Sequence, residues 1–259
     1  MIDAHVHLDN GPLTLEYLLE FIEVAKKEKI NEIHILNHTH RFREFALLYE
    51  DCKCNNEQTE WFTNRDLKDS IEDYIKLINK VRGMNLPVKV LFGLEVCYFK
   101  DREDLLKELL SKYDFDFLIG SVHFINNIAY DCKWSIKELW DKYDVDYLYK
   151  TYYDSINSLI KSKLFTQVGH MDTIKMFNRY PTYDLKDTYI EIAKLLNENN
   201  VIAENNTKIH YGYGHKEIGL NNEFLDILRN NNCKIISSSD AHEPESVGKL
   251  FDKIYINIY

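Results

Sequence analysis

Residues 2–40 read IDAHVHLDNGPLTLEYLLEFIEVAKKEKINEIHILNHTH, and the pattern of this segment recurs along the whole chain. The β-prone runs Ile2–Val6 and Glu32–Leu36 predict two strands. Between them, Leu13–Lys29 has apolar residues three or four positions apart, which predicts an amphipathic helix with Thr14 as its N-cap. A strand, a helix and a second strand in this order predict two parallel strands joined by a crossover helix.

The same alternation continues through the rest of the sequence. Five more strands are predicted at Pro87–Leu94, Phe115–Ser121, Phe165–Val168, Val201–Glu204 and Lys234–Ser238. Helices are predicted at Asp66–Arg82 (ending before Gly83), Asp101–Lys112, Asp146–Ser162, Asp184–Asn199 and Asn221–Asn231. About seven such units in roughly 250 residues predict a closed or nearly closed parallel β/α barrel, one domain over 1–259. A doubly wound open sheet is the alternative.

Two segments do not follow this pattern. Tyr49–Asn64 lacks clear periodicity, so we expect a loop over one end of the sheet that could act as a lid. Lys253–Tyr259 alternates like one more short strand.

The composition excludes several classes of protein. With 259 residues, 45% hydrophobic and 29% charged, the chain is typical of a globular domain rather than of a disordered or membrane protein. The N-terminus lacks the basic segment of a secretory signal, and the five cysteines form no CxxC pair, so we expect a cytoplasmic protein with reduced thiols. The net charge of −10 argues against a duplex nucleic-acid binder.

Residues of the kinds that bind metals follow every predicted strand. In chain order they are His5 and His7, His38 and His40, Glu95, His123, His170 and Asp172, Glu204, and Asp240 and His242. Because the carboxyl ends of parallel strands meet at one face of a barrel, these side chains are expected to converge on one site. His34, in the middle of its strand, is interpreted as structural, whereas His210 and His215 could contact either substrate or solvent.

The converging side chains are imidazoles and carboxylates without sulfur, a set that suits divalent Zn, Mn or Fe. At least six candidate ligands exceed the needs of one ion, so two or three divalent ions are expected. Glu95 could bridge two of them, and the pair would lower the pKa of a shared water. His40 could be a ligand, a substrate contact or a residue that supports a ligand.

The motifs at the strand ends resemble those of the polymerase-and-histidinol-phosphatase (PHP) superfamily, over almost the whole chain. They are Asp3-x-His5-x-His7, His38, Gly93-Leu94-Glu95, Gly120-Ser121-Val122-His123-Phe124, Gly169-His170-x-Asp172 and Ser239-Asp240-Ala241-His242. The Gly-Ser-Val-His-Phe motif, Trp140 and Val247-Gly248 are most similar to the histidinol-phosphatase branch.

This resemblance implies a distorted seven-stranded β/α barrel and a metal-dependent phosphatase that releases phosphate from L-histidinol phosphate in histidine biosynthesis. The implied ligands are His5, His7, Glu95 and Asp240 for one ion, Glu95, His123 and His170 for a second, and His38 and His242 for a third. Another small phosphorylated metabolite or a nucleotide is the alternative substrate.

The chain departs from the family pattern at two places. Relatives often supply another ligand after the first histidine pair from a Cys-Pro-His-like segment, where this chain reads Leu8-Asp9-Asn10-Gly11-Pro12. Asp9 or His40 could replace that ligand, or the third site could be weak. Many relatives carry an arginine in Asn-Thr-x-Gly-x-Arg after the sixth strand, whereas residues 206–211 of this chain contain Lys208 and no arginine.

For phosphate-ester hydrolysis we assign catalytic roles to Glu95, Asp240 and His242, with Asp240 or His242 handling the proton of the leaving group. Cations should bind the phosphate oxygens. The candidate substrate contacts are His40, Arg41, Arg43, Lys175, Arg179, Lys208, His215 and Lys216. A phosphodiesterase, exonuclease or amidohydrolase on the same scaffold is a second hypothesis, and a non-enzymatic metal-bound domain is a third. No oligomeric state follows from the sequence.

Overall fold

One sheet of seven parallel strands forms the centre of the protein. The computed structural model describes residues 1–53, 55–65 and 67–254. The strands are β1 (Ile2–His7), β2 (Glu32–Leu36), β3 (Lys89–Cys97), β4 (Phe117–Ser121), β7 (Gln167–Val168), β8 (Ile202–Asn206) and β9 (Ile235–Ser238). They are hydrogen-bonded in the order β1-β2-β3-β4-β7-β8-β9, so each strand pairs with the next one along the chain.

The sheet curls until its last strand returns to its first. Val6 in β1 forms a parallel bridge with Ala241, just beyond β9, and the His7 amide donates to the Ala241 carbonyl at 2.7 Å. The described strands therefore form a nearly closed barrel, and the predicted distorted seven-stranded β/α barrel is confirmed. The open doubly wound sheet is wrong for this chain.

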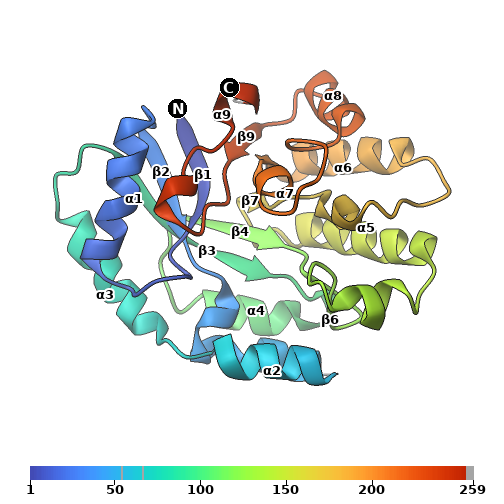
Figure 1. Ribbon diagram of the computed structural model, residues 1–259, viewed down its shortest axis with the longest axis horizontal. Coiled ribbons are helices and arrows are strands. Elements are labelled where there is room, and N and C mark those ends of the chain that lie inside the picture. The colour runs from blue at the N-terminus through green and yellow to red at the C-terminus, as the bar shows by residue number, and fades with distance from the viewer. Residues whose placement is uncertain (54, 66, 255–259) are drawn as a thin grey trace.

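Helices surround the strands on the outside of the barrel (Figure 1). The six predicted helices are confirmed, each within a few residues of its expected ends. They are α1 (Leu15–Lys27), α3 (Ile71–Arg82), α4 (Glu103–Leu110), α5 (Val145–Ser162), α6 (Lys186–Asn199) and α8 (Asn222–Asn230). Shorter elements are the hairpin β5 (Phe124–Ile125) and β6 (Ile128–Ala129), α2 (Asn56–Arg65), α7 (Lys208–Tyr211), α9 (Phe251–Ile254), a π-helix at Ile136–Trp140 and several 3₁₀ turns.

The first crossover helix shows how the sequence produces this packing. Thr14 caps α1 by accepting a hydrogen bond from the Tyr17 amide at 3.3 Å, as predicted. The side chains of Leu18, Phe21 and Ile22 are buried, and each such side chain stabilises the fold by about 1.5–3 kcal/mol. Among the described helices, none is long and apolar enough to cross a lipid bilayer.

Two predictions about local structure are wrong. Tyr49–Asn64 is not a loop, because a 3₁₀ segment at Arg43–Cys52 and helix α2 cover most of it, and Tyr49 is buried. A 3₁₀ helix repeats every three residues and α2 is short and polar, so neither shows the apolar spacing of 3.6 residues by which an α-helix is predicted. The strand expected at Lys253–Tyr259 is also wrong where the structure describes it, since α9 continues to Ile254; residues 255–259 lie outside the described part of the chain.

A buried carboxylate ties the first strand to the segment after the last one. Asp3 accepts hydrogen bonds from the Ser239 amide at 2.9 Å, the Ser239 hydroxyl at 2.6 Å and the Gly248 amide at 2.8 Å. Burial raises the pKa of Asp3 to about 6, although these hydrogen bonds act in the opposite direction. Asp3 therefore helps to hold the barrel closed.

Replacing Asp3 with alanine should lower the free energy of unfolding by about 3 kcal/mol, because three donors lose their buried acceptor. Urea denaturation of the wild type and of Asp3→Ala in the same buffer measures this. Asp104→Ala is the control, since Asp104 is fully exposed, and it should change the stability by less than about 0.5 kcal/mol. An Asp3→Ala protein as stable as the control would contradict the role of Asp3.

Candidate metal centre

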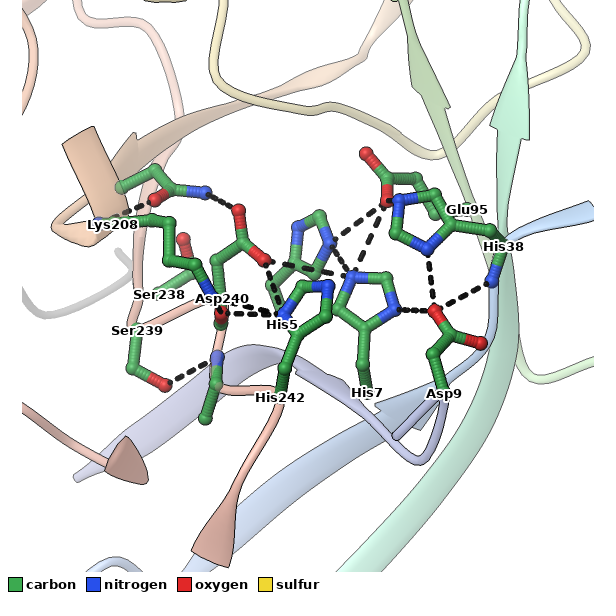
Figure 2. Close-up of polar contacts among 12 residues, drawn as sticks. His5, His7, Asp9, His38, Glu95, Lys208, Ser238, Ser239, Asp240 and His242 are labelled. Carbon is green, nitrogen blue, oxygen red and sulfur yellow. Dashed lines mark hydrogen bonds and ion pairs between the residues drawn. The ribbon is translucent and has the colours of Figure 1, made fainter. Parts of the chain in front are cut away.

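The carboxyl ends of the strands open into a cavity of about 280 Å³. Its metal-type lining residues are Asp9, His38, His40, Glu95, Cys132, His123, Asp131, His170, Asp240 and His242. His5 and His7 lie buried beside them (Figure 2). The structure thus brings together all eight residues that were predicted as metal ligands.

The carboxylate of Glu95 stands at the centre of this group and is itself buried. Its Oε2 lies 2.8 Å from Nε2 of His38, and its Oε1 lies 2.9 Å from Nε2 of His170. The Nε2 atoms of His5, His7 and His123 are each 3.3 Å from one of the two oxygens. One carboxylate therefore contacts five imidazoles.

The strands place these side chains through their alternation and register. His5 and His7 are two residues apart on β1, so both point to the same side, and their Nε2 atoms lie 2.8 Å apart. His38 lies two residues after the end of β2 and forms a parallel bridge with Glu95 on β3. His170 and Asp240 have left-handed backbone angles, φ +24° and +54°, which side chains adopt at a cost that functional sites commonly bear.

The donor atoms form three overlapping groups that fit divalent ions. Within each group the atoms lie within 4.8 Å of one another. The groups are His7, Asp9, His38 and His242; His5, His7 and Asp240; and His38, Glu95 and His123. A cluster of imidazole nitrogens and carboxylate oxygens at these distances is a donor set that suits a divalent metal. The geometry supports divalent metal binding.

Charges within the site shift the pKa values of its members. Burial alone would raise the pKa of Glu95, but the charges of His38, His123 and His5 hold it well below its ordinary value. The pKa of Asp240 is also lowered, against burial, by His5 and Lys208. Both carboxylates therefore stay ionised, which is the form that binds a metal.

Asp9 belongs to the site, although the sequence left open whether Asp9 or His40 supplies this ligand. Its Oδ2 lies 2.7 Å from Nδ1 of His7 and 2.5 Å from Nδ1 of His38 (Figure 2). His40, the other candidate for this place, stacks on His38 with ring centroids 4.5 Å apart and contacts Trp61 on the cavity wall. Of these two, Asp9 alone is in the described groups of possible ligands.

Glu204, in the middle of β8, contacts two of the histidines on the side away from the cavity. Its Oε1 lies 2.8 Å from Nδ1 of His5, and its Oε2 accepts the His170 amide at 2.9 Å. Ser238 donates to the same carboxylate through its hydroxyl. The sequence placed Glu204 at a strand end, but only the structure shows that it orients ligands rather than lining the cavity.

Lys208 is the one lysine or arginine among the described residues that line the cavity. Its Nζ lies 3.0 Å from Nδ1 of His242 and donates to the Asp240 carbonyl at 2.9 Å (Figure 2). Lys208 therefore places a positive charge beside the predicted catalytic pair.

The other predicted cations make structural contacts instead. Arg41 is buried and pairs with Asp69 at 2.6 Å, while its remaining donors bond to the Leu8 and Gly11 carbonyls and to Asn37. Lys175 is buried between Asp172 and Glu217, at 2.6 Å from each. Both side chains use their donors within the protein, so the structure corrects their assignment as substrate contacts.

Two more assignments are corrected in the same way. Arg179 donates to the Trp140 carbonyl and to Asp141 at the surface. His215 is buried, with Nε2 3.1 Å from the Tyr180 hydroxyl and Nδ1 accepting the Glu217 amide. Neither is among the described residues that line the cavity. His34 contacts Glu32 at 2.8 Å on β2, which agrees with its structural interpretation.

Comparisons with known proteins agree with this geometry. The family model of the PHP domain matches residues 3–208. A relative from Schizosaccharomyces pombe named "Probable histidinol-phosphatase" is 24% identical over 95% of this chain and 82% of its own length.

Two solved structures share the fold. A candidate histidinol phosphatase from Listeria monocytogenes has a TM-score of 0.72 at 18% identity, covering 97% of this chain and 99% of its own. The histidinol phosphate phosphatase of Lactococcus lactis, complexed with zinc, L-histidinol and phosphate, has a TM-score of 0.64 at 17% identity, covering 94% and 86%. At these identities the two structures show the fold alone.

Replacing Glu204 with glutamine should weaken metal binding about 10- to 100-fold, because His5 loses the carboxylate that orients its ring. Isothermal titration calorimetry of the metal-free protein with zinc measures the affinity. Glu198→Gln on the exposed face of α6 is the matched control and should bind zinc like the wild type. Equal affinities for the two variants would show that Glu204 does not support the ligands.

Proposed function

The chain belongs to the PHP domain family, and from this premise we propose that it is a metal-dependent phosphatase acting on L-histidinol phosphate. The single observation that carries the chemistry is the contact of Glu95 with five imidazoles, a donor set that suits bound divalent cations. The choice of substrate is supported by the name of the S. pombe relative and by the L-histidinol and phosphate in the L. lactis structure.

Two or three ions of zinc, manganese or iron fit the three groups of ligands. We assign His5, His7, Glu95 and Asp240 to one ion, Glu95, His123 and His170 to a second, and His38 and His242, joined by Asp9, to a third. When bound, such ions neutralise phosphate charge and lower the pKa of a coordinated water.

The side chains of the cavity supply binding and proton transfer. Lys208 is positioned to bind a phosphate oxygen and to stabilise the negative charge that develops there. Asp240 and His242 lie next to it and can take a proton from the attacking water and pass it to the leaving alkoxide. In this way one lysine takes the place of the arginine that many relatives carry.

The cavity suits a small phosphomonoester rather than a polymer. Its volume of about 280 Å³ matches a compact metabolite, and its described lining contains a single lysine. A single-stranded nucleic acid would need a continuous basic groove, which the net charge of −10 also disfavours. We propose that the enzyme acts in the cytoplasm on such a metabolite.

Purified protein should release inorganic phosphate from L-histidinol phosphate, with two or three divalent ions bound per chain. Phosphate release and metal content are measured on the same sample, before and after treatment with a chelator. Activity should fall with the metal content and return when zinc or manganese is added. If the protein binds metal but hydrolyses only a different phosphoester, the proposed substrate is wrong and the proposed metal-dependent reaction stands.

Replacing Lys208 with glutamine should lower kcat/KM about 10- to 150-fold, the loss expected for one charge-assisted hydrogen bond. Lys208→Arg should keep much of the activity, because the charge is retained. Lys216→Gln is the matched control, since Lys216 lies over the Tyr180 ring outside the cavity lining. A Lys208→Gln enzyme as active as this control would remove Lys208 from phosphate binding.

A further inference from the structure

The cavity has a second wall that the metal chemistry does not use. Besides the histidines and their carboxylates, the described lining includes the aromatic residues Trp61, Phe124 and Tyr213 together with Asp131 and Cys132. Asp131 follows the hairpin formed by β5 and β6. A phosphate held at the metal ligands would leave the rest of the substrate facing this wall.

Asp131 differs from the other carboxylates of the cavity. Asp9 and Glu95 lie within 3 Å of histidine nitrogens, and Asp240 lies 3.4 Å from His242. For Asp131, no lysine, arginine or histidine of the described chain is within 4 Å of the carboxylate, and its one polar side-chain contact is the Cys132 thiol at 3.9 Å. A half-buried carboxylate without a cation is poised to accept one from a ligand.

The backbone that carries Asp131 is firmly held. The Ala129 amide donates to Gln58 at 2.8 Å, and the Tyr130 carbonyl accepts from the Ser135 hydroxyl at 2.8 Å and the Trp140 ring at 2.9 Å. Trp140 and Ser135 are buried. The position of Asp131 is therefore set before a ligand arrives, which lowers the entropy lost on binding.

Tyr213, Asp131 and Asp240 line the same cavity, and Tyr213 is 47% exposed, so its ring is accessible to a bound ligand.

We propose that Asp131 determines specificity for the leaving group by binding an ammonium that the leaving group carries. This inference rests on the proposed phosphatase function and adds the residue that recognises the leaving group. An ammonium would form a charge-assisted hydrogen bond with Asp131, beside aromatic faces that also favour cations. Leaving groups with a second negative charge would be repelled.

The test compares two substrates that differ only in the amino group: L-histidinol phosphate and 3-(imidazol-4-yl)propyl phosphate. At pH 7.5 the imidazole of both is largely neutral. Asp131→Asn should lower kcat/KM for the amino substrate about 10- to 100-fold, mainly through KM. With the substrate that lacks the amine, kcat/KM should stay within about twofold of the wild type.

Two controls separate recognition from damage to the fold. Asp104→Asn removes an exposed carboxylate and the same charge, and it should behave like the wild type with both substrates. The metal content and Tm of Asp131→Asn should also match the wild type. Equal losses with both substrates, or no loss with either, would overturn the proposal.

Calorimetric titration with L-histidinol, the dephosphorylated amino alcohol, makes the test independent of turnover. If the wild type hydrolyses neither ester but binds L-histidinol more tightly than Asp131→Asn does, the proposed reaction fails and the recognition by Asp131 stands. If the wild type is active and both proteins bind L-histidinol equally, the role of Asp131 fails alone. Inactivity together with no binding would overturn both.

Discussion

One carboxylate shared among five imidazoles is the constraint on which the rest of this structure depends. Glu95 is buried, and neither its charge nor the surrounding ring nitrogens can be satisfied by water. A bound divalent cation would balance this arrangement, and its binding would then stabilise the folded state. The parallel bridge between His38 and Glu95 and the closure of the barrel through Asp3 both hold the donors at this point.

A carboxylate behind the ligand group explains how the imidazoles are oriented. Glu204 contacts Nδ1 of His5 and accepts the His170 amide, whereas Asp9 is itself a candidate ligand that faces both His7 and His38. A carboxylate behind a ligating histidine sets its tautomer and makes the outer nitrogen a better ligand.

The sequence predicted the barrel and the convergence of its histidines, because both follow from periodicity and from where each strand ends. It did not predict the direction of long side chains. Arg41 follows His40 directly but turns to Asp69, and Lys175 pairs with Asp172 and Glu217, whereas Lys208 points into the cavity. Asp69 and Glu217 are distant in sequence from the cations that they hold, and Glu204 is distant from the histidines that it contacts. The 3₁₀ segment at 43–52 was missed because its period differs from that of an α-helix.

The division of the cavity into two walls also explains how selectivity can arise in such an enzyme. In the proposed reaction, ions and Lys208 would hold a phosphate group in the same way whatever alcohol it esterifies, so they would not distinguish one monoester from another. Discrimination has to come from contacts with the leaving group, and the wall of Trp61, Tyr213 and Asp131 offers those contacts. Because this wall contributes no ligand to the described metal groups, its residues can differ between relatives without loss of the chemistry.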